Sequence, residues 1–362
     1  MISTRTATVS ILLLILGLPL SSHADTSAND AFRAIRKIST STGIEQQEMV
    51  NIGGVPQWIS IRARDRNAPI LLMLHGGPGF TLSPVSDYYM RDWEEFFTVV
   101  QWDQRGAGKS YREEMRESLA PTLTIDQLVR DTEELIELLR KRFKRDRVVL
   151  MAHSFGTLLG VKVAQRRPDL LHAYVGMGQF VDFMRSEALG YEATLADARA
   201  EKNTEAVAAL EAIAPFPDPA RPERNLQNLP IERRWLAHYG GYFHAGGEGH
   251  HFAVAQLSPT YTAAELQARQ EAHNFIVEAI WKELDSVQLN DAVEFKVPII
   301  IMQGRYDRGT SSQLVKEWHA ALKAPHKKLV WFENSSHMVY EEEPGKLLVA
   351  LATEVLPLTQ PN

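Results

Sequence analysis

The sequence predicts an α/β protein with a mostly parallel, doubly wound sheet and an inserted helical cap. Short apolar runs, typical of strands that are buried on both faces, occur at residues 70–74, 98–102, 147–151 and 297–302. Between the second and third runs, residues 124–143 have the apolar spacing of an amphipathic helix, and Thr124 with Gln127 forms a capping-box pattern. In such a sheet, ligands bind at the carboxyl ends of the strands.

The predicted sheet is divided into two parts by a segment of different character. Residues 181–292 contain no apolar strand run; they have helical patterns over 186–214, a Pro-rich break at 215–219 and a Gly/His loop at 239–251. We therefore expect a helical cap at 181–292, inserted between core segments 25–180 and 293–362. Residues 48–64, around Gly53 and Gly54, are expected to form an antiparallel hairpin that leads into the sheet.

Residues 1–24 have the pattern of a secretory signal peptide. Arg5 precedes an apolar stretch at 11–20, which ends in Ser22-His23-Ala24, a small-x-small cleavage pattern. This stretch is shorter than the roughly 20 residues of a transmembrane helix, although an uncleaved anchor is the alternative. We expect cleavage after Ala24 and an exported protein, periplasmic or secreted, with no stable membrane insertion afterwards.

The composition excludes several classes of protein. Lys and Arg number 39 against 45 Asp and Glu, and a net charge of −6 argues against nucleic-acid partners. The chain has no Cys, which excludes disulfides, a thiol nucleophile and thiolate metal sites. The one candidate metal cluster, His238, His244, His250 and His251 with Glu248, lacks a helical His-x-x-x-His spacing, so we expect a solvated loop there. We expect neither a metal nor another cofactor.

The strongest chemical signal is the pentapeptide Ala152-His-Ser-Phe-Gly156. It follows the apolar run at 147–151 and precedes a helical run at 157–165, which is the strand, turn and helix context of a nucleophile elbow. Ser154 is the candidate nucleophile, and the small flanking residues suit a turn in which strand and helix approach closely. The alternative is a buried serine that begins a helix.

A serine nucleophile needs a base and an acid, and the chain supplies both in the order Ser, Asp, His. Asp307 follows the run at 297–302, and His337 follows a strand-like segment at 328–332. His337 is therefore the expected base and Asp307 the acid that orients it. Asp182, after the preceding strand, is the reserve acid.

The loop His75-Gly-Gly-Pro-Gly79 follows the strand at 70–74 and is the candidate oxyanion hole. Its glycines allow the backbone to approach a substrate closely. We assign the donors to the backbone N–H groups of Gly77 and Phe155, one from this loop and one from the residue after the nucleophile. A purely structural glycine turn is the alternative.

Together with Asp103-Gln-Arg-Gly-Ala-Gly-Lys-Ser110, these motifs resemble the proline iminopeptidase family of α/β-hydrolases. The resemblance covers most of the mature chain, but the cap matches far less clearly. It implies an α/β-hydrolase fold and a serine exopeptidase that releases an amino-terminal proline or a related residue from peptides. Ala152 and Phe155 stand where the family usually has Gly and Trp, so the wall of the pocket differs.

The end of that motif, Gly108-Lys-Ser110, also resembles a phosphate-binding loop. A loop of that kind needs Gly at position 103, which is Asp here, and its carboxylate would repel phosphate. The family resemblance instead implies that Asp103 and Arg105 brace the loops around the active site.

An aminopeptidase must hold a protonated amine, and carboxylates of the cap are the expected partners. Glu187 and Glu192 are candidates, but five positions on a helix separate them by about 140°, so they do not share a face. Solvated surface is the alternative for both. The expected partner is a small peptide or another small molecule. Two other functions remain open: an esterase, amidase or lactonase for small neutral substrates, and a non-catalytic binding protein.

Overall fold

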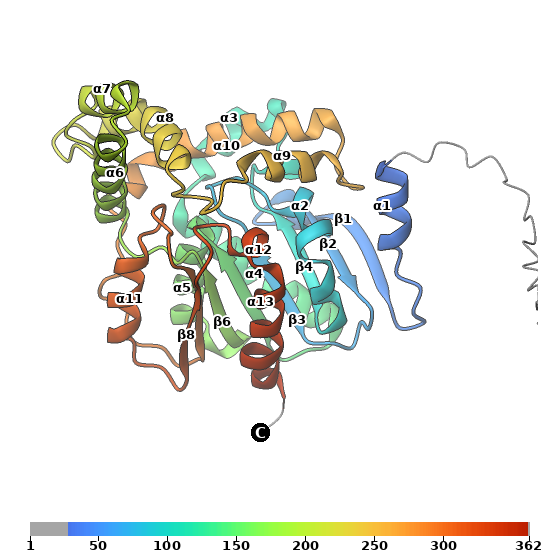
Figure 1. The fold of residues 1–362 in the computed structure, drawn as a ribbon. Helices are drawn as coiled ribbons and strands as arrows, with labels where there is room; N and C mark the ends of the chain where they lie inside the picture. The colour runs from blue at the N-terminus through green and yellow to red at the C-terminus, as the bar shows by residue number, and fades with distance from the viewer. Residues whose placement is uncertain (1–27, 361–362) are drawn as a thin grey trace, which may run out of the picture.

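An eight-stranded sheet forms the centre of the molecule in the computed structural model, which describes residues 28–360 (Figure 1). The predicted signal peptide lies outside these residues. The strand order is β1-β2-β4-β3-β5-β6-β7-β8; β1 and β2 form an antiparallel hairpin, β2 pairs antiparallel with β4, and all other pairs are parallel. The strands are β1 (Ile44–Ile52), β2 (Val55–Ala63), β3 (Ile70–Leu74), β4 (Thr98–Asp103), β5 (Val148–His153), β6 (Leu171–Met177), β7 (Ile299–Gly304) and β8 (Lys327–Phe332). The predicted fold class and hairpin are confirmed.

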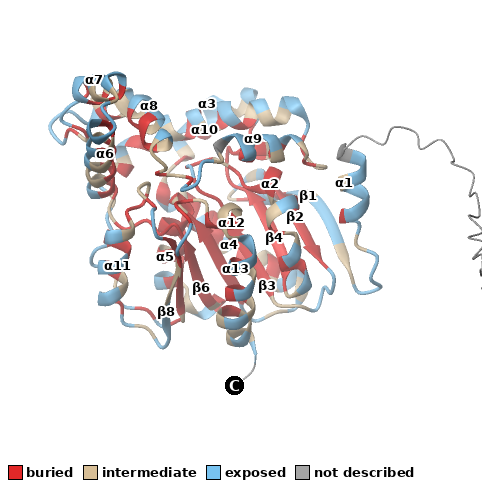
Figure 2. Ribbon diagram, in the orientation of Figure 1, coloured by how far each residue is buried: buried red, intermediate tan, exposed pale blue. Residues whose placement is uncertain are grey.

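Helices cover both faces of the sheet, which explains the continuous apolar runs of the central strands. In β3, Leu72 and Leu74 belong to one buried cluster, whereas Leu71 and Met73 belong to another, because successive strand side chains point to opposite faces. The central strands are accordingly buried along nearly their whole length in Figure 2. The helices outside the cap include α1 (Ala28–Arg36), α2 (Ser83–Tyr89), α3 (Arg116–Leu119), α4 (Ile125–Phe143), α5 (Phe155–Arg166), α11 (Ser312–Ala321), α12 (Val339–Glu342) and α13 (Pro344–Ala350).

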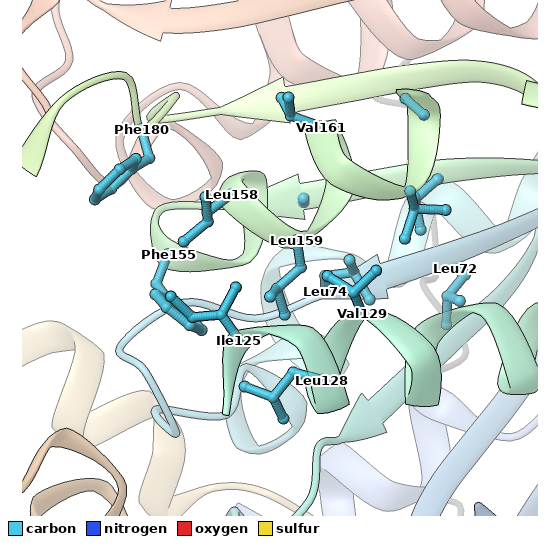
Figure 3. Packing of buried hydrophobic residues seen from close by; sticks show 14 of the residues in the cluster. Leu72, Leu74, Ile125, Leu128, Val129, Phe155, Leu158, Leu159, Val161 and Phe180 are labelled. Carbon is cyan, nitrogen blue, oxygen red and sulfur yellow. The ribbon is translucent and has the colours of Figure 1, made fainter. Parts of the chain in front are cut away.

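Helix α4 is the amphipathic helix that the sequence predicts. The side chain of Thr124 accepts a hydrogen bond of 3.1 Å from the backbone N–H of Gln127 and so caps the first turn. The apolar face of α4 packs beside α5, the helix that follows Ser154, and Figure 3 shows Leu128 and Leu159 from this packing. This contact anchors the amino-terminal half of α5 and thereby the turn before it.

The cap lies between β6 and β7, above the carboxyl ends of the parallel strands (Figure 1). Its helices are α6 (Phe183–Ala200), α7 (Thr204–Ala212), α8 (Pro222–His238), α9 (Glu248–Gln256) and α10 (Ala263–Leu284). The predicted loop at 239–251 is wrong at its end, because α9 begins at Glu248. Within the described part of the chain, no helix is long and apolar enough to span a membrane.

Candidate active site

Ser154 occupies the sharp turn between β5 and α5. Its backbone has φ 54° and ψ −127°, a conformation that non-glycine residues rarely adopt. Its N–H donates to the Met177 carbonyl at 2.9 Å, and its own carbonyl accepts from the N–H of Thr157 at 2.8 Å and from the Thr157 hydroxyl at 2.5 Å. A Cβ at Gly156 would lie 2.6 Å from the carbonyl oxygen of His75, so glycine is required there. The local geometry is that of the predicted elbow.

Asp307 and His337 lie together on the loops that follow β7 and β8. His337 Nδ1 is 2.8 Å from Asp307 Oδ2, and both side chains are buried. Burial opposes ionisation of Asp307, but attraction to His337 and hydrogen bonds from His337 and Thr310 outweigh it, so the pKa of Asp307 lies below its usual value. Among the described residues, no hydrogen bond joins the Ser154 hydroxyl to His337. Such bonds are often long before substrate binds.

The reserve acid, Asp182, does not approach His337. Its side chain caps α6, where it accepts a hydrogen bond of 3.0 Å from the N–H of Arg185, and it also accepts one from Asn290 at 2.9 Å. The acid in contact with the histidine is therefore Asp307.

The glycine loop after β3 lies against Ser154. A Cβ at Gly76 would lie 2.6 Å from Ser154 Cβ and 3.3 Å from its Oγ, so the loop backbone contacts the serine directly. Gly77 has φ 113°, which favours glycine. The hydrogen bonds within residues 28–360 use neither the N–H of Gly77 nor that of Phe155, and both residues line the same cavity. Two backbone donors are thus free at the position expected for an oxyanion hole.

A cavity of about 700 Å³ lies between the core and the cap and is lined by Ser154 and His337. Helices α6, α8 and α10 supply one part of its apolar wall, including Phe183, Leu226, Leu229, Val277 and Trp281. The walls would accommodate an apolar group next to Ser154, because burial of apolar surface favours binding.

The charged side of the cavity is formed by Glu187 of α6 and Arg233 of α8. Arg233 donates to both carboxylate oxygens of Glu187, at 2.8 and 2.5 Å, and also pairs with Glu232. Burial raises the pKa of Glu232 to about 7; the charge of Arg233 opposes this shift and the charge of Glu187 adds to it. One of the buried oxygens of Glu232 has no hydrogen-bond partner in the described chain. The sequence-based reasoning did not find Glu232 or Arg233.

The structure separates the two predicted cap acids. Glu187 is buried and lines the cavity, whereas Glu192 is exposed and does not line it. The expectation for Glu192 is therefore wrong, because the helix turns this residue away from the core, as the spacing of five implies.

One segment of the cap is hydrogen-bonded to the loops that carry Asp307 and His337. The carbonyl of Gly241 accepts from the N–H of Arg308 at 3.3 Å and from the Ser336 hydroxyl at 2.7 Å. The next carbonyl, that of Tyr242, accepts from the N–H of His337 at 3.0 Å. The phenol ring of Tyr242 also contacts His337 edge-on, with ring centroids 5.5 Å apart. The cap therefore takes part in positioning the histidine.

The solvated loop that the sequence predicts holds for part of the histidine-rich segment: His238, His244 and His250 are exposed, whereas His251 is not. His251 is buried, its Nδ1 lies 2.5 Å from Glu341, and its Nε2 lies 3.3 Å from a nitrogen of Arg269. This contact ties α9 to the core, which explains why a Gly/His-rich segment is helical. Across residues 28–360 no group of three potential metal ligands occurs.

Asp103 and Arg105 brace the loops as the resemblance implies. Asp103 accepts hydrogen bonds from the Ser83 hydroxyl at 2.6 Å and from the N–H of Lys109 at 2.9 Å. Arg105 pairs with Asp131 through two bonds of 2.7 and 2.9 Å, with both side chains buried. These contacts are structural, and the Asp103 carboxylate already accepts the Lys109 N–H of the Gly108-Lys-Ser110 segment.

Comparison with known proteins identifies the family of the fold. The family model for the alpha/beta hydrolase fold matches residues 69–344. A probable aminopeptidase of Bacillus subtilis (strain 168) is 29% identical over 303 residues, covering 82% of this chain and 92% of that protein. The proline iminopeptidase of Neisseria gonorrhoeae is 26% identical over 303 residues, covering 79% and 88%.

Solved structures show the same fold at lower identity. A proline iminopeptidase-related protein from Thermus thermophilus superposes with a TM-score of 0.62 at 23% identity, covering 87% of this chain and 99% of that one. The proline iminopeptidase of Mycobacterium smegmatis also has a TM-score of 0.62, at 19% identity, with the same coverage. The chain therefore belongs to the α/β-hydrolase fold family, and within it resembles the proline iminopeptidases.

Proposed function

We propose that the protein is a serine hydrolase in which Ser154 is the nucleophile. His337 takes the serine proton as Oγ attacks the substrate carbonyl, and Asp307 stabilises the imidazolium that forms. The N–H groups of Gly77 and Phe155 donate to the oxyanion. The scissile bond then breaks as His337 gives the serine proton to the leaving amine or alcohol, which leaves an acyl-enzyme and a neutral histidine. Water attacks the acyl-enzyme with the same base, and the acid is released as Ser154 regains its proton. The observation that carries the proposal is one cavity that joins Ser154, the His337–Asp307 pair and two free backbone donors.

We further propose that the substrate is a peptide whose free amino terminus binds in the cap, with proline or a similar residue released. Glu187 lines the cavity, and Glu232, which is not part of the cavity lining, pairs with the same Arg233 and has one oxygen without a hydrogen-bond partner among the described residues. An ammonium group near these acids would share Glu187 with Arg233, and Glu232 would lose its proton. The pair of carboxylates would then balance two cations. The names of the relatives, aminopeptidase and proline iminopeptidase, point in the same direction.

A neutral substrate is the second candidate, and one observation favours it. Both oxygens of Glu187 already accept hydrogen bonds from Arg233, so the described residues that line the cavity offer no unpaired carboxylate to an amine. An esterase or amidase would use the same Ser154 chemistry against the apolar wall of the cap.

Hydrolysis of three substrates separates these functions: a prolyl arylamide, an alanyl arylamide and a short-chain aryl ester. Each is tested with the wild-type protein and with Ser154→Ala. Preference for the prolyl substrate that disappears in the variant is the expected result. Hydrolysis of the ester alone would support Ser154 as the nucleophile but contradict the aminopeptidase function. Inactivity on all three would favour a binding protein.

A further inference from the structure

The carboxylate of Asp307 accepts hydrogen bonds from other groups in addition to His337. Its Oδ2 atom accepts from His337 Nδ1 at 2.8 Å, from the Thr310 hydroxyl at 2.8 Å and from Gln303 Nε2 at 2.9 Å. Its Oδ1 atom accepts from the Thr310 N–H at 3.0 Å. Gln303 lies on β7, four residues before Asp307, and is completely buried. Gln303 and His337 therefore donate hydrogen bonds to the same oxygen of Asp307.

Gln303 is itself held from the other side. Its Oε1 atom accepts from the backbone N–H of Gln179 at 3.0 Å, and the side chain of Gln179 accepts from the Tyr174 hydroxyl at 2.7 Å. Both of these residues are fully buried. The amide of Gln303 therefore cannot rotate without leaving the N–H of Gln179 unpaired, which fixes its nitrogen toward Asp307.

The same network reaches the elbow. The Thr157 hydroxyl accepts from the N–H of Phe180 at 2.8 Å and donates to the Ser154 carbonyl at 2.5 Å. Phe180 directly follows Gln179, whose Nε2 donates to the Phe180 carbonyl at 2.7 Å. Buried polar groups behind the cavity thus connect the acid of the triad with the backbone of the serine.

We propose that Gln303 is a positioning residue of the triad, which holds Asp307 Oδ2 toward His337 and moderates how strongly this carboxylate stabilises the imidazolium. The inference rests on the triad of the proposed function and is independent of its substrate. A hydrogen bond donated to a carboxylate withdraws charge from it, and three donors share one oxygen here. Loss of the Gln303 donor leaves a carboxylate that attracts a proton on His337 more strongly but is oriented less firmly.

Reaction of Ser154 with a fluorophosphonate probe as a function of pH tests this role without a natural substrate. In Gln303→Met, which keeps a long unbranched side chain but removes the donor, the acid-side midpoint of the labelling rate should move up by about 0.5–1 pH unit. The plateau rate should fall about threefold to tenfold through poorer alignment. Gln303→Leu should show the same changes in midpoint and plateau. Agreement between the two variants would assign the effect to the lost hydrogen-bond donor rather than to the shape of the new side chain.

A matched control is available in Gln101→Met. Gln101 is also a buried strand glutamine, but within residues 28–360 its side-chain nitrogen donates a hydrogen bond to the sulfur of Met90 alone, at 3.2 Å. Its variant should keep the wild-type midpoint. The proposal is overturned if folded Gln303→Met keeps both the midpoint and the plateau, or if Gln101→Met shifts the midpoint equally. Failure of the prolyl substrate with intact labelling would reject the peptidase and leave the role of Gln303 standing, whereas equal labelling of Ser154→Ala would reject the triad itself.

Discussion

The two sides of the cavity hold their charged groups in different ways. On the core side, both oxygens of Asp307 accept hydrogen bonds, and the pKa of this acid lies below its usual value. On the cap side, Glu232 pairs with the cavity residue Arg233 without lining the cavity itself; among the described residues one of its buried oxygens has no hydrogen-bond partner, and its pKa is raised to about 7. A fully bonded acid is positioned before any ligand binds, whereas an incompletely bonded one gains from a ligand cation. The contrast suits a core that performs the reaction and a cap that recognises the substrate.

Replacement of the nucleophile should have the largest effect on the core side. Ser154→Ala removes the group that attacks the carbonyl, and we expect kcat to fall by about 10⁴–10⁶-fold on any substrate that the protein hydrolyses. Steady-state rates on the arylamide and ester substrates measure this loss. A variant that keeps a tenth of the wild-type rate would show that another residue is the nucleophile.

A substitution in the glycine loop after β3 should have the second largest effect on activity. Gly77→Ala forces a side chain onto a backbone with φ 113°, and its Cβ would lie 2.5 Å from the N–H nitrogen of Phe80. Displacement of the N–H of residue 77 should lower kcat by about 100-fold to 1000-fold. Gly54→Ala is the matched control, because Gly54 has φ 80° with no atom within 4 Å of a Cβ. If both variants lose the same activity, general backbone strain and not the oxyanion hole is responsible.

On the cap side, the effect should depend on the substrate. Glu187→Gln removes the charge that we propose binds the substrate's amine, and loss of a charged hydrogen bond of about 1.5–3 kcal/mol should raise KM for a prolyl arylamide roughly tenfold or more. Turnover of the aryl ester should remain within a factor of about two. Exposed Glu192→Gln should change neither substrate. An equal loss on amide and ester after Glu187→Gln would contradict amine recognition by this residue.

The pH dependence of substrate preference should give the smallest effect. Glu232 is protonated below a pKa of about 7 and ionised above it, so it attracts an ammonium group only at the higher pH. The ratio of kcat/KM for the prolyl arylamide to kcat/KM for the ester should therefore rise severalfold between about pH 6 and 8. Both reactions depend on His337 in the same way, so this dependence cancels in the ratio. In Glu232→Gln the ratio should stay flat. A rise that persists in this variant would assign the titration to another group.

Much of the fold could be predicted because burial on both faces leaves a direct trace in the sequence. The core strands appear as continuous apolar runs, and α4 has both a cap residue and a regular apolar face. Helices α8 and α9 gave no such signal. Pro230 lies within α8, and α9 begins among Gly and His residues, so local propensity opposes both helices and contacts with the rest of the protein decide.

In the candidate site too, some residues could be predicted from local sequence patterns and others could not. Ser154, Asp307 and His337 could be predicted because each follows a strand, and parallel strands bring their carboxyl ends together. Arg233 and Gln303 could not, because their roles depend on contacts with side chains or loops that no local pattern specifies. Glu187 and Arg233 are 46 residues apart and meet only because α6 and α8 pack together.

The most direct test of the account compares a prolyl arylamide with the same compound acetylated on its nitrogen. Acetylation removes the positive charge and leaves the scissile amide unchanged, so only the contribution of the cap is altered. We expect kcat/KM to fall by at least about tenfold on acetylation, since the acetylated substrate has no ammonium group to interact with Glu187 and Glu232. Equal hydrolysis of both compounds would show that the cap does not recognise an amino terminus and would contradict the aminopeptidase function.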